Sequence, residues 1–171
     1  PSEEPDPAVS VDSVMTWHDR LMGDTDAARA ARAYLDGRGI SGTALRSIRV
    51  GLAHTPTDGR SEWWIMIPVT DRTADEPRVI AVKGFGFDPH RGDWVRRGGQ
   101  KVARNGGSAA LLDLSYDPDG ASLICEGEAD ALCALSHGFN AMTGTAGAGT
   151  WKGEWSEYVS DRTDAAVICY D

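Results

Sequence analysis

Acidic residues cluster directly after a short apolar run in the last third of the chain. Residues 122–125 read Ser-Leu-Ile-Cys, and Glu126, Glu128 and Asp130 follow them. A second apolar run, residues 165–170, leads into Asp171. Carboxylates that share a crevice repel one another, so a cation or a hydrogen-bond network has to compensate them. Mg²⁺ suits such a place because it prefers hard oxygen ligands and usually takes one or two carboxylates alongside waters and phosphates.

The spacing of the three acids predicts different roles for them. Glu126 and Asp130 are four residues apart, which puts them on the same side of the first turn of a helix. Glu128 has an ordinary explanation, because an acid at a helix start is stabilised by the positive N-terminus of the helix and stays solvated. We therefore expect chemistry at Glu126, a metal-site companion in Asp130, and a solvated surface acid in Glu128.

The elements around these acids predict an α/β fold. Strand patterns at 121–125, 140–145 and 165–171 alternate with helix patterns at 129–139 and 151–161, and a glycine loop covers 146–150. Short connections between alternating strands and helices predict a parallel sheet covered by helices. Functional sites in such sheets lie beyond the carboxyl ends of the strands. Glu126 and Asp171 are therefore expected on one edge.

The first two thirds of the chain predict a separate subdomain of mixed α/β structure. Helix patterns cover 11–22 and, after an Asp24 or Thr25 cap, 26–36, and Ser41 can cap a third, short helix. Strand patterns at 48–54, 62–71 and 78–87 suggest an antiparallel meander, and the many glycines of 84–107 suggest an irregular, loop-rich stretch. We expect a flexible N-terminus over 1–9, a helical and basic subdomain over 10–118, and the strand-helix unit over 119–171.

Charge is divided unevenly along the chain. The net charge is −9, yet residues 77–104 hold seven basic and two acidic residues, whereas residues 105–171 hold two basic and eleven acidic residues. A basic segment followed by an acidic one fits a polyanion partner on one side and metal cations on the other. The plainer alternative is that both segments are simply solvated faces.

Several classes of protein are disfavoured. The three cysteines, Cys125, Cys133 and Cys169, show no CxxC spacing, which favours reduced thiols in a cytoplasmic protein over disulfides or a zinc site. The four histidines show no metal-ligand spacing. No apolar run approaches the roughly 18 residues that a bilayer-spanning helix needs. The glycine-rich residues 144–149 lack the consecutive Lys-Ser/Thr that ends a phosphate-binding P-loop.

Three segments in order resemble the Toprim domain, the Rossmann-like acidic fold shared by bacterial primases, type IA and II topoisomerases and some nucleases. They are LICEGEADALCAL (123–135), GFNAMTGTAG (138–147) and AAVICYD (165–171). The resemblance implies that Glu126 is the acid/base or metal-organising glutamate and that Asp130 joins a Mg²⁺ or Mn²⁺ site. Asp171 would be the first aspartate of the Asp-x-Asp motif, at which this Toprim domain is truncated.

Upstream, AARAYLDGRGISGTALRSIRVGLA (30–53) resembles the opening of the catalytic core of DnaG-type bacterial and phage primases. That resemblance implies a DNA primase catalytic-core fragment, a nucleotidyltransferase that serves DNA replication in a cell, phage or plasmid. Its reaction would be template-directed RNA primer synthesis on single-stranded DNA from nucleoside triphosphates, with two-metal assistance. A replicative helicase is the further partner implied.

Under this resemblance the basic segment would hold template or nucleotide phosphates. The residues concerned are Lys83, Arg91, Arg96, Arg97, Lys101 and Arg104, with Lys83 and Lys101 favoured because glycines beside them permit close approach of a ligand. Trp94 could stack on an unpaired base or pack in the core. Two other functions remain open: a Toprim nuclease or topoisomerase-like strand-cleaving module, and a non-catalytic single-stranded DNA binding fragment.

Overall fold

Three helices open the chain, as the sequence predicts. The structure is a computed structural model that describes residues 9–57, 60–71, 78–97, 100–101, 103–106, 109–117, 120–146 and 148–170. Helices α1 (Val11–Met22), α2 (Asp26–Gly37) and α3 (Gly42–Ile48) each begin after a residue whose side-chain oxygen accepts a hydrogen bond from a first-turn N–H. These capping residues are Ser10, Thr25 and Ser41.

The strands that follow form an antiparallel sheet, here called the meander sheet. Strands β1 (Gly51–Thr57), β2 (Arg60–Asp71) and β3 (Arg78–Asp88) pair in order, and β4 (Asp93–Trp94) and β7 (Ala103–Gly106) both pair with β3. Strands β5 (Arg96–Arg97) and β6 (Gln100–Lys101) form a separate two-stranded ribbon. The predicted meander is confirmed. The prediction of an irregular stretch over 84–107 is wrong in part, because β3 continues to Asp88 and short strands follow.

A second sheet, here called the C-terminal sheet, has the strand order β11-β9-β10-β8. Its strands are β8 (Leu111–Asp113), β9 (Ser122–Cys125), β10 (Asn140–Gly144) and β11 (Ala166–Cys169). β9 runs parallel to β10 and β11, as predicted, whereas β8 pairs antiparallel with β10 and was not predicted. Helix α4 (Glu128–Ser136) follows β9, and η1 (Ala148–Thr150) and α5 (Gly153–Ser160) follow β10. The predicted α/β fold class is confirmed.

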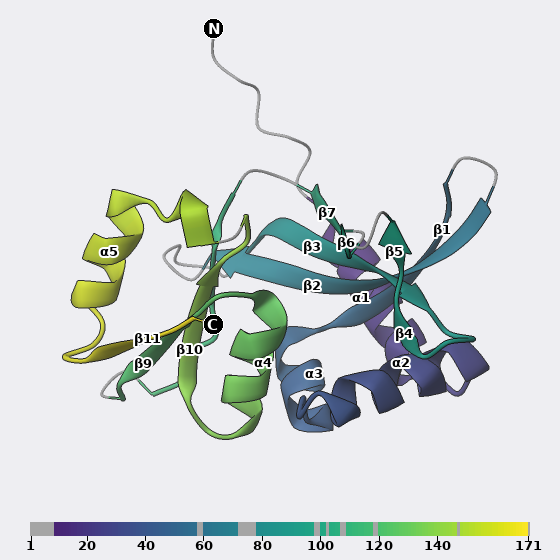
Figure 1. The fold of residues 1–171 in the computed structure, drawn as a ribbon, viewed down its shortest axis with the longest axis horizontal. Helices are drawn as coiled ribbons and strands as arrows, with labels where there is room; N and C mark the ends of the chain where they lie inside the picture. The colour runs from purple at the N-terminus through teal and green to yellow at the C-terminus, as the bar shows by residue number, and fades with distance from the viewer. Residues whose placement is uncertain are drawn as a thin grey trace, which may run out of the picture.

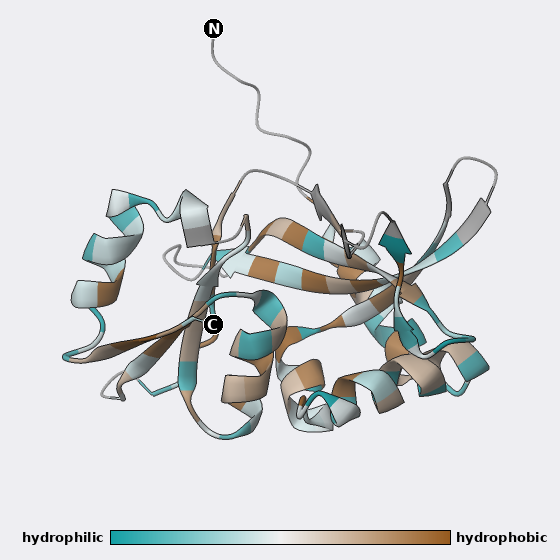
Figure 2. Cartoon of the chain, viewed as in Figure 1, coloured by the Kyte–Doolittle hydropathy of each residue, from teal (hydrophilic) through white to brown (hydrophobic). Residues whose placement is uncertain are grey.

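Helices cover both faces of the C-terminal sheet. Residues alternate along each strand: Ile124 and Met142 pack with Val159 of α5, whereas Cys125 and Ala141 pack in the same cluster as Leu132 of α4. Figure 1 shows α4 and α5 on opposite sides of β9 and β10, with α2 and α3 beside α4. Figure 2 shows the hydrophobic residues along β2, β3 and β9, where the layers meet.

One buried cluster extends through both sheets. It joins Leu35 of α2, Ile65 of β2 and Phe87 of β3 to Leu112 of β8 and Leu132 of α4. A smaller cluster of Ala53, Trp64, Met66 and Val82 lies on the other face of the meander sheet, beside Trp17 of α1. Because the large cluster is continuous, the two sheets share one core. The division near residue 118 stays a prediction, and β8, which precedes it, pairs with the C-terminal sheet.

No helix among the described residues is both long and apolar enough to cross a membrane.

Candidate metal and phosphate site

Glu126 and Asp130 lie together at the carboxyl edge of the C-terminal sheet. Glu126 directly follows β9, and Asp130 lies in the first turn of α4. Both side chains are exposed, and with Cys169 and Tyr170 they line a pocket of about 320 Å³. The two acids thus share one pocket, although Glu126 precedes Gly127, the N-cap of α4, and does not lie in the first turn of the helix as their spacing suggested. Burial raises the pKa of the neighbouring Cys125 thiol to about 11, so that side chain stays protonated beside the pocket.

Arg38, which was not among the predicted site residues, is a neighbour of this pocket. Its guanidinium Nη2 lies 3.5 Å from Asp130 Oδ1, and the two side chains are 32% and 56% exposed. The residues are 92 positions apart, so no local pattern could have paired them. The available signal was that Arg38 lies in the YLDGRGI part of the segment that resembles primases.

The prediction that Glu128 is a solvated acid is wrong. Glu128 does begin α4, but its side chain is buried, and the residue is only 6% exposed. Burial raises the pKa of its carboxyl, while its own backbone N–H and the ammonium of Lys83 act in the opposite direction. The physical reason is that the start of α4 turns toward the meander sheet, where Lys83 supplies a compensating charge.

Lys83 reaches from β3 to the C-terminal sheet. Its Nζ lies 3.9 Å from Glu128 Oε1 and donates a hydrogen bond of 2.8 Å to the carbonyl oxygen of Thr145, directly after β10. Thr145 is held in turn by two hydrogen bonds with Ala110. Lys83, which the sequence favoured as a phosphate contact, therefore lies beside the start of α4, and its side chain is 13% exposed. Its partner Glu128 follows Glu126 by two residues in the chain.

The other basic residues lie on β3–β7 and the turn between β3 and β4. Arg91, in that turn, and Arg96 of β5 are exposed, whereas for Arg97, Lys101 and Arg104 only the backbone is described. Arg96 is the register partner of Lys101, and Arg104 is the partner of Gly84, the residue after Lys83. Arg104 thus lies on the strand beside Lys83, whereas Arg96, Arg97 and Lys101 lie on the separate β5–β6 ribbon.

Trp94 is a core residue in this structure. It is 7% exposed, and its ring lies 4.8 Å from the ring of Tyr34 and 5.2 Å from that of Phe85, measured between centroids. Neighbouring aromatic rings thus occupy the place that a base would need. Of the two alternatives for Trp94, its surroundings fit packing in the core.

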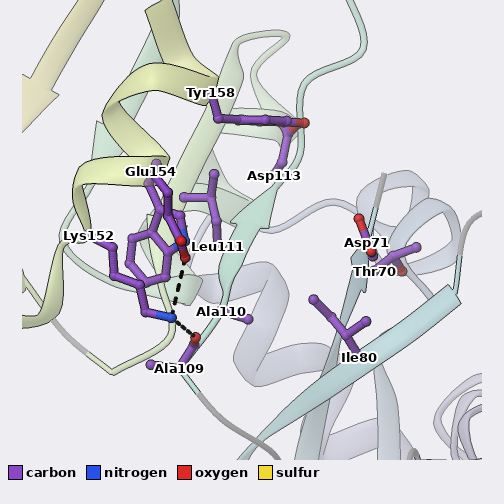
Figure 3. Close-up of a pocket in the computed structure, with 11 residues that line it drawn as sticks. Thr70, Asp71, Ile80, Ala109, Ala110, Leu111, Asp113, Lys152, Glu154 and Tyr158 are labelled. Atoms are coloured by element: carbon purple, nitrogen blue, oxygen red, sulfur yellow. Dashed lines mark hydrogen bonds and ion pairs between the residues drawn. The ribbon is translucent and has the colours of Figure 1, made fainter. Parts of the chain in front are cut away.

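A separate pocket lies between α5, β8 and the facing ends of β2 and β3 (Figure 3). Lys152 Nζ lies 3.6 Å from Glu154 Oε1 and donates to the carbonyl oxygen of Ala109, while Tyr158 donates to Asp113 at 2.7 Å. The Lys152–Glu154 pair is exposed, unlike Lys83–Glu128. It therefore offers a natural control for the buried pair.

The donor set at the carboxyl edge fits Mg²⁺ in part. Glu126 and Asp130 supply the one or two carboxylates that this ion usually takes from a protein. Within the described ranges, no three His, Cys, Asp or Glu side chains gather closely enough to hold a metal. Asp171, the third predicted ligand, lies outside the described residues.

No protein-family model matches the chain, and no curated protein matches it. Several solved structures share its fold. The catalytic domain of a DnaG primase bound to single-stranded DNA gives a TM-score of 0.63 and 18% identity, covering 94% of this chain and 61% of that one. The Escherichia coli primase catalytic core gives 0.61 and 18%, covering 95% and 62%.

A third structure is the RNA polymerase domain of Mycobacterium tuberculosis primase DnaG, in complex with double-stranded DNA with a six-nucleotide overhang. It gives a TM-score of 0.57 and 14% identity, covering 92% of this chain and 60% of that one. The chain thus spans about three fifths of these structures. It has the fold of a DnaG-type primase catalytic core, as the resemblance implied.

Proposed function

We propose that this chain is a catalytic-core fragment of a primase that makes RNA primers on single-stranded DNA. The observation that carries the proposal is the meeting of carboxylates and a cation at one edge of a DnaG-type primase fold. Glu126 and Asp130 line one pocket there, and Lys83 contacts Glu128, which lies between these two acids in the sequence. Two of the structural neighbours are themselves bound to DNA, which supports a nucleic-acid partner.

The reaction joins the 3′-hydroxyl oxygen of the growing strand to the α-phosphorus of an incoming ribonucleoside triphosphate. The bond from that phosphorus to the bridging oxygen of the β-phosphate breaks, and pyrophosphate leaves. Glu126 accepts the hydroxyl proton, directly or through a water, because its carboxylate is exposed at the pocket. The basic residues of β3–β7 hold template and nucleotide phosphates in register.

Glu126 and Asp130 are the residues that would hold Mg²⁺ or Mn²⁺, with Asp171 assigned to the same Toprim-type site from its sequence motif alone. When bound there, the ion would supply charge neutralisation for the phosphate groups. Arg38 orients the Asp130 carboxylate through its contact at 3.5 Å. A replicative helicase as partner remains a prediction of the resemblance, and a cytoplasmic location remains a prediction from the cysteine pattern.

Primer synthesis tests the proposal directly. Single-stranded template, ribonucleoside triphosphates and Mg²⁺ or Mn²⁺ are given to this chain and to a version extended past Asp171. Glu126→Gln should lower the rate at least about 100-fold, because a carboxamide cannot take up the proton. Template affinity should stay within about twofold, because Glu126 carries no phosphate contact in this scheme. Glu157→Gln on α5, also exposed, is the matched control.

If neither version makes primers, or if Glu126→Gln keeps the wild-type rate, the primase proposal is wrong. Cleavage of the template instead of synthesis would identify a Toprim nuclease. Template binding without either reaction would identify a single-stranded DNA binding module.

A further inference from the structure

The Lys83–Glu128 pair is a buried ionic contact between the two sheets. Lys83 lies on β3 of the meander sheet, and Glu128 begins α4 beside the C-terminal sheet. Their side chains are 13% and 8% exposed. A buried charge that loses its partner is strongly destabilising, so each member of such a pair constrains the other. The pair lies at the carboxyl edge, next to the proposed phosphate and metal site.

The Lys83–Glu128 contact is an attraction between charges without a hydrogen bond between the two side chains. The separation of 3.9 Å between Lys83 Nζ and Glu128 Oε1 is too long for a hydrogen bond. Glu128 Oε1 is buried and has no hydrogen-bond partner among the described residues. An ammonium group has three N–H donors, and Lys83 directs one of them to Thr145. Lys83 is thus held by its hydrogen bond to Thr145, whereas its ion pair with Glu128 is long and includes no hydrogen bond.

We propose that Glu128 is a built-in counter-ion for Lys83 which an incoming phosphate group has to displace, so that Glu128 sets how tightly this site holds phosphate. The inference rests on the proposed function, which assigns phosphate contacts to Lys83. A phosphate oxygen is a charge-assisted acceptor that can approach the ammonium within hydrogen-bond distance, which Glu128 does not. The carboxylate meanwhile repels the phosphate, so it weakens binding and restricts the site to ligands with enough other contacts. Glu128 is therefore a positioning residue that acts through Lys83.

The test measures phosphate affinity in two arms at low salt. One arm follows a labelled oligothymidylate by fluorescence anisotropy, and the other follows Mg²⁺-ATP by calorimetry, so that template and nucleotide phosphates are distinguished. Glu128→Gln keeps the side-chain shape and removes the charge. It should lower Kd about three- to tenfold in at least one arm, because the repulsion is lost while Lys83 keeps its anchor at Thr145. A purely structural role for Glu128 would leave affinity unchanged or weaken it.

Glu154→Gln is the matched control, since Glu154 Oε1 lies 3.6 Å from Lys152 Nζ in an exposed pair. It should change Kd by less than about twofold, because exposed charges are screened. Lys83→Met should weaken binding, and adding Glu128→Gln to it should give a smaller gain than Glu128→Gln gives alone, because only the direct repulsion of the phosphate is then removed. If Glu128→Gln fails to fold, Glu128→Asp, which draws the charge back from Lys83, should show the same gain to a smaller extent.

Unchanged or weaker binding by the folded Glu128 variants in both arms overturns the inference. If Lys83→Met binds with wild-type affinity in both arms, Lys83 contacts no phosphate. The phosphate role of Lys83 in the proposed function then fails together with this inference. The Glu126 experiment on primer synthesis stays independent of both results.

Discussion

Glu126 and Glu128 are separated by one residue, yet their surroundings are opposite. Glu126 lies in the link between β9 and α4 and is exposed at the pocket, whereas Glu128 begins the helix and turns inward to Lys83. Two acids of the same type are thus suited to different purposes at one strand end. A surface carboxylate can meet substrate and metal, and a buried one can only balance a charge.

Alanine substitutions should separate the two glutamates by stability. Glu128→Ala leaves the Lys83 ammonium buried beside an uncharged side chain, and we expect it to lower the free energy of unfolding by about 2–3 kcal/mol. Glu126→Ala removes an exposed side chain, and its effect should stay within about 0.5 kcal/mol. Urea unfolding followed by circular dichroism measures both. Equal losses for the two variants would contradict the buried ion pair.

At the scale of elements, the meander sheet depends on a close approach between α1 and β1. His18 Nδ1 donates a hydrogen bond of 2.8 Å to the carbonyl oxygen of Val50, one residue before β1 begins. Gly51 opens the strand, and a Cβ placed on it would lie 2.5 Å from the Cβ of Trp17 and 2.8 Å from the Trp17 carbonyl carbon. Only a residue without a side chain lets the helix backbone come this near.

Gly51→Ala should therefore push α1 away from β1. Because the new methyl group meets helix backbone, the structure cannot relax by moving one side chain, and we expect a loss of about 2–3 kcal/mol in the free energy of unfolding. Gly37→Ala at the end of α2 is the control. A Cβ there meets nothing within 4 Å, so that variant should be neutral or slightly stabilising. Thermal unfolding compares the two, and a neutral Gly51→Ala would refute the close approach.

At the scale of the whole molecule, one continuous core supports an uneven distribution of charge. The same buried cluster includes Phe87 of the basic part of the chain and Leu132 of the acidic part, so the two parts are held together by packing. The sign of the charge changes where the sheets meet, at Lys83 and Glu128. A nucleic acid would therefore be attracted to the basic residues of β3–β7 and repelled by the acidic part of the chain.

Binding to single-stranded DNA should accordingly depend steeply on salt. If all six basic residues from Lys83 to Arg104 contact phosphates, the logarithm of the binding constant should fall with the logarithm of salt concentration at a slope of about −4. Arg91→Ala and Arg96→Ala should each make that slope shallower by about 0.7. Arg29→Ala is the control, since Arg29 already pairs with Asp24 and Asp26 on the surface. Anisotropy titrations across salt concentrations give the slopes, and a flat dependence would exclude the basic segment as the binding surface.

The sequence alone was enough for the three N-terminal helices, for the meander strands and for the strand end that Glu126 follows, whereas β8 and the short strands after β3 were not predicted. Ser10, Thr25 and Ser41 mark the helix starts through hydrogen bonds within one turn, and the alternation of strands and helices places Glu126 beyond a parallel strand. These features depend on residues close together in the chain, so periodicity and capping patterns report them.

Only the tertiary structure decided which charged and aromatic side chains meet. Lys83 reaches Thr145 across 62 positions, and Arg38 reaches Asp130 across 92. The same packing buries Glu128 and Trp94. The local pattern had predicted a solvated Glu128, and it left both base stacking and core packing open for Trp94. Burial and charge pairing arise from contacts between distant segments, and those contacts exist only once the two sheets share a core.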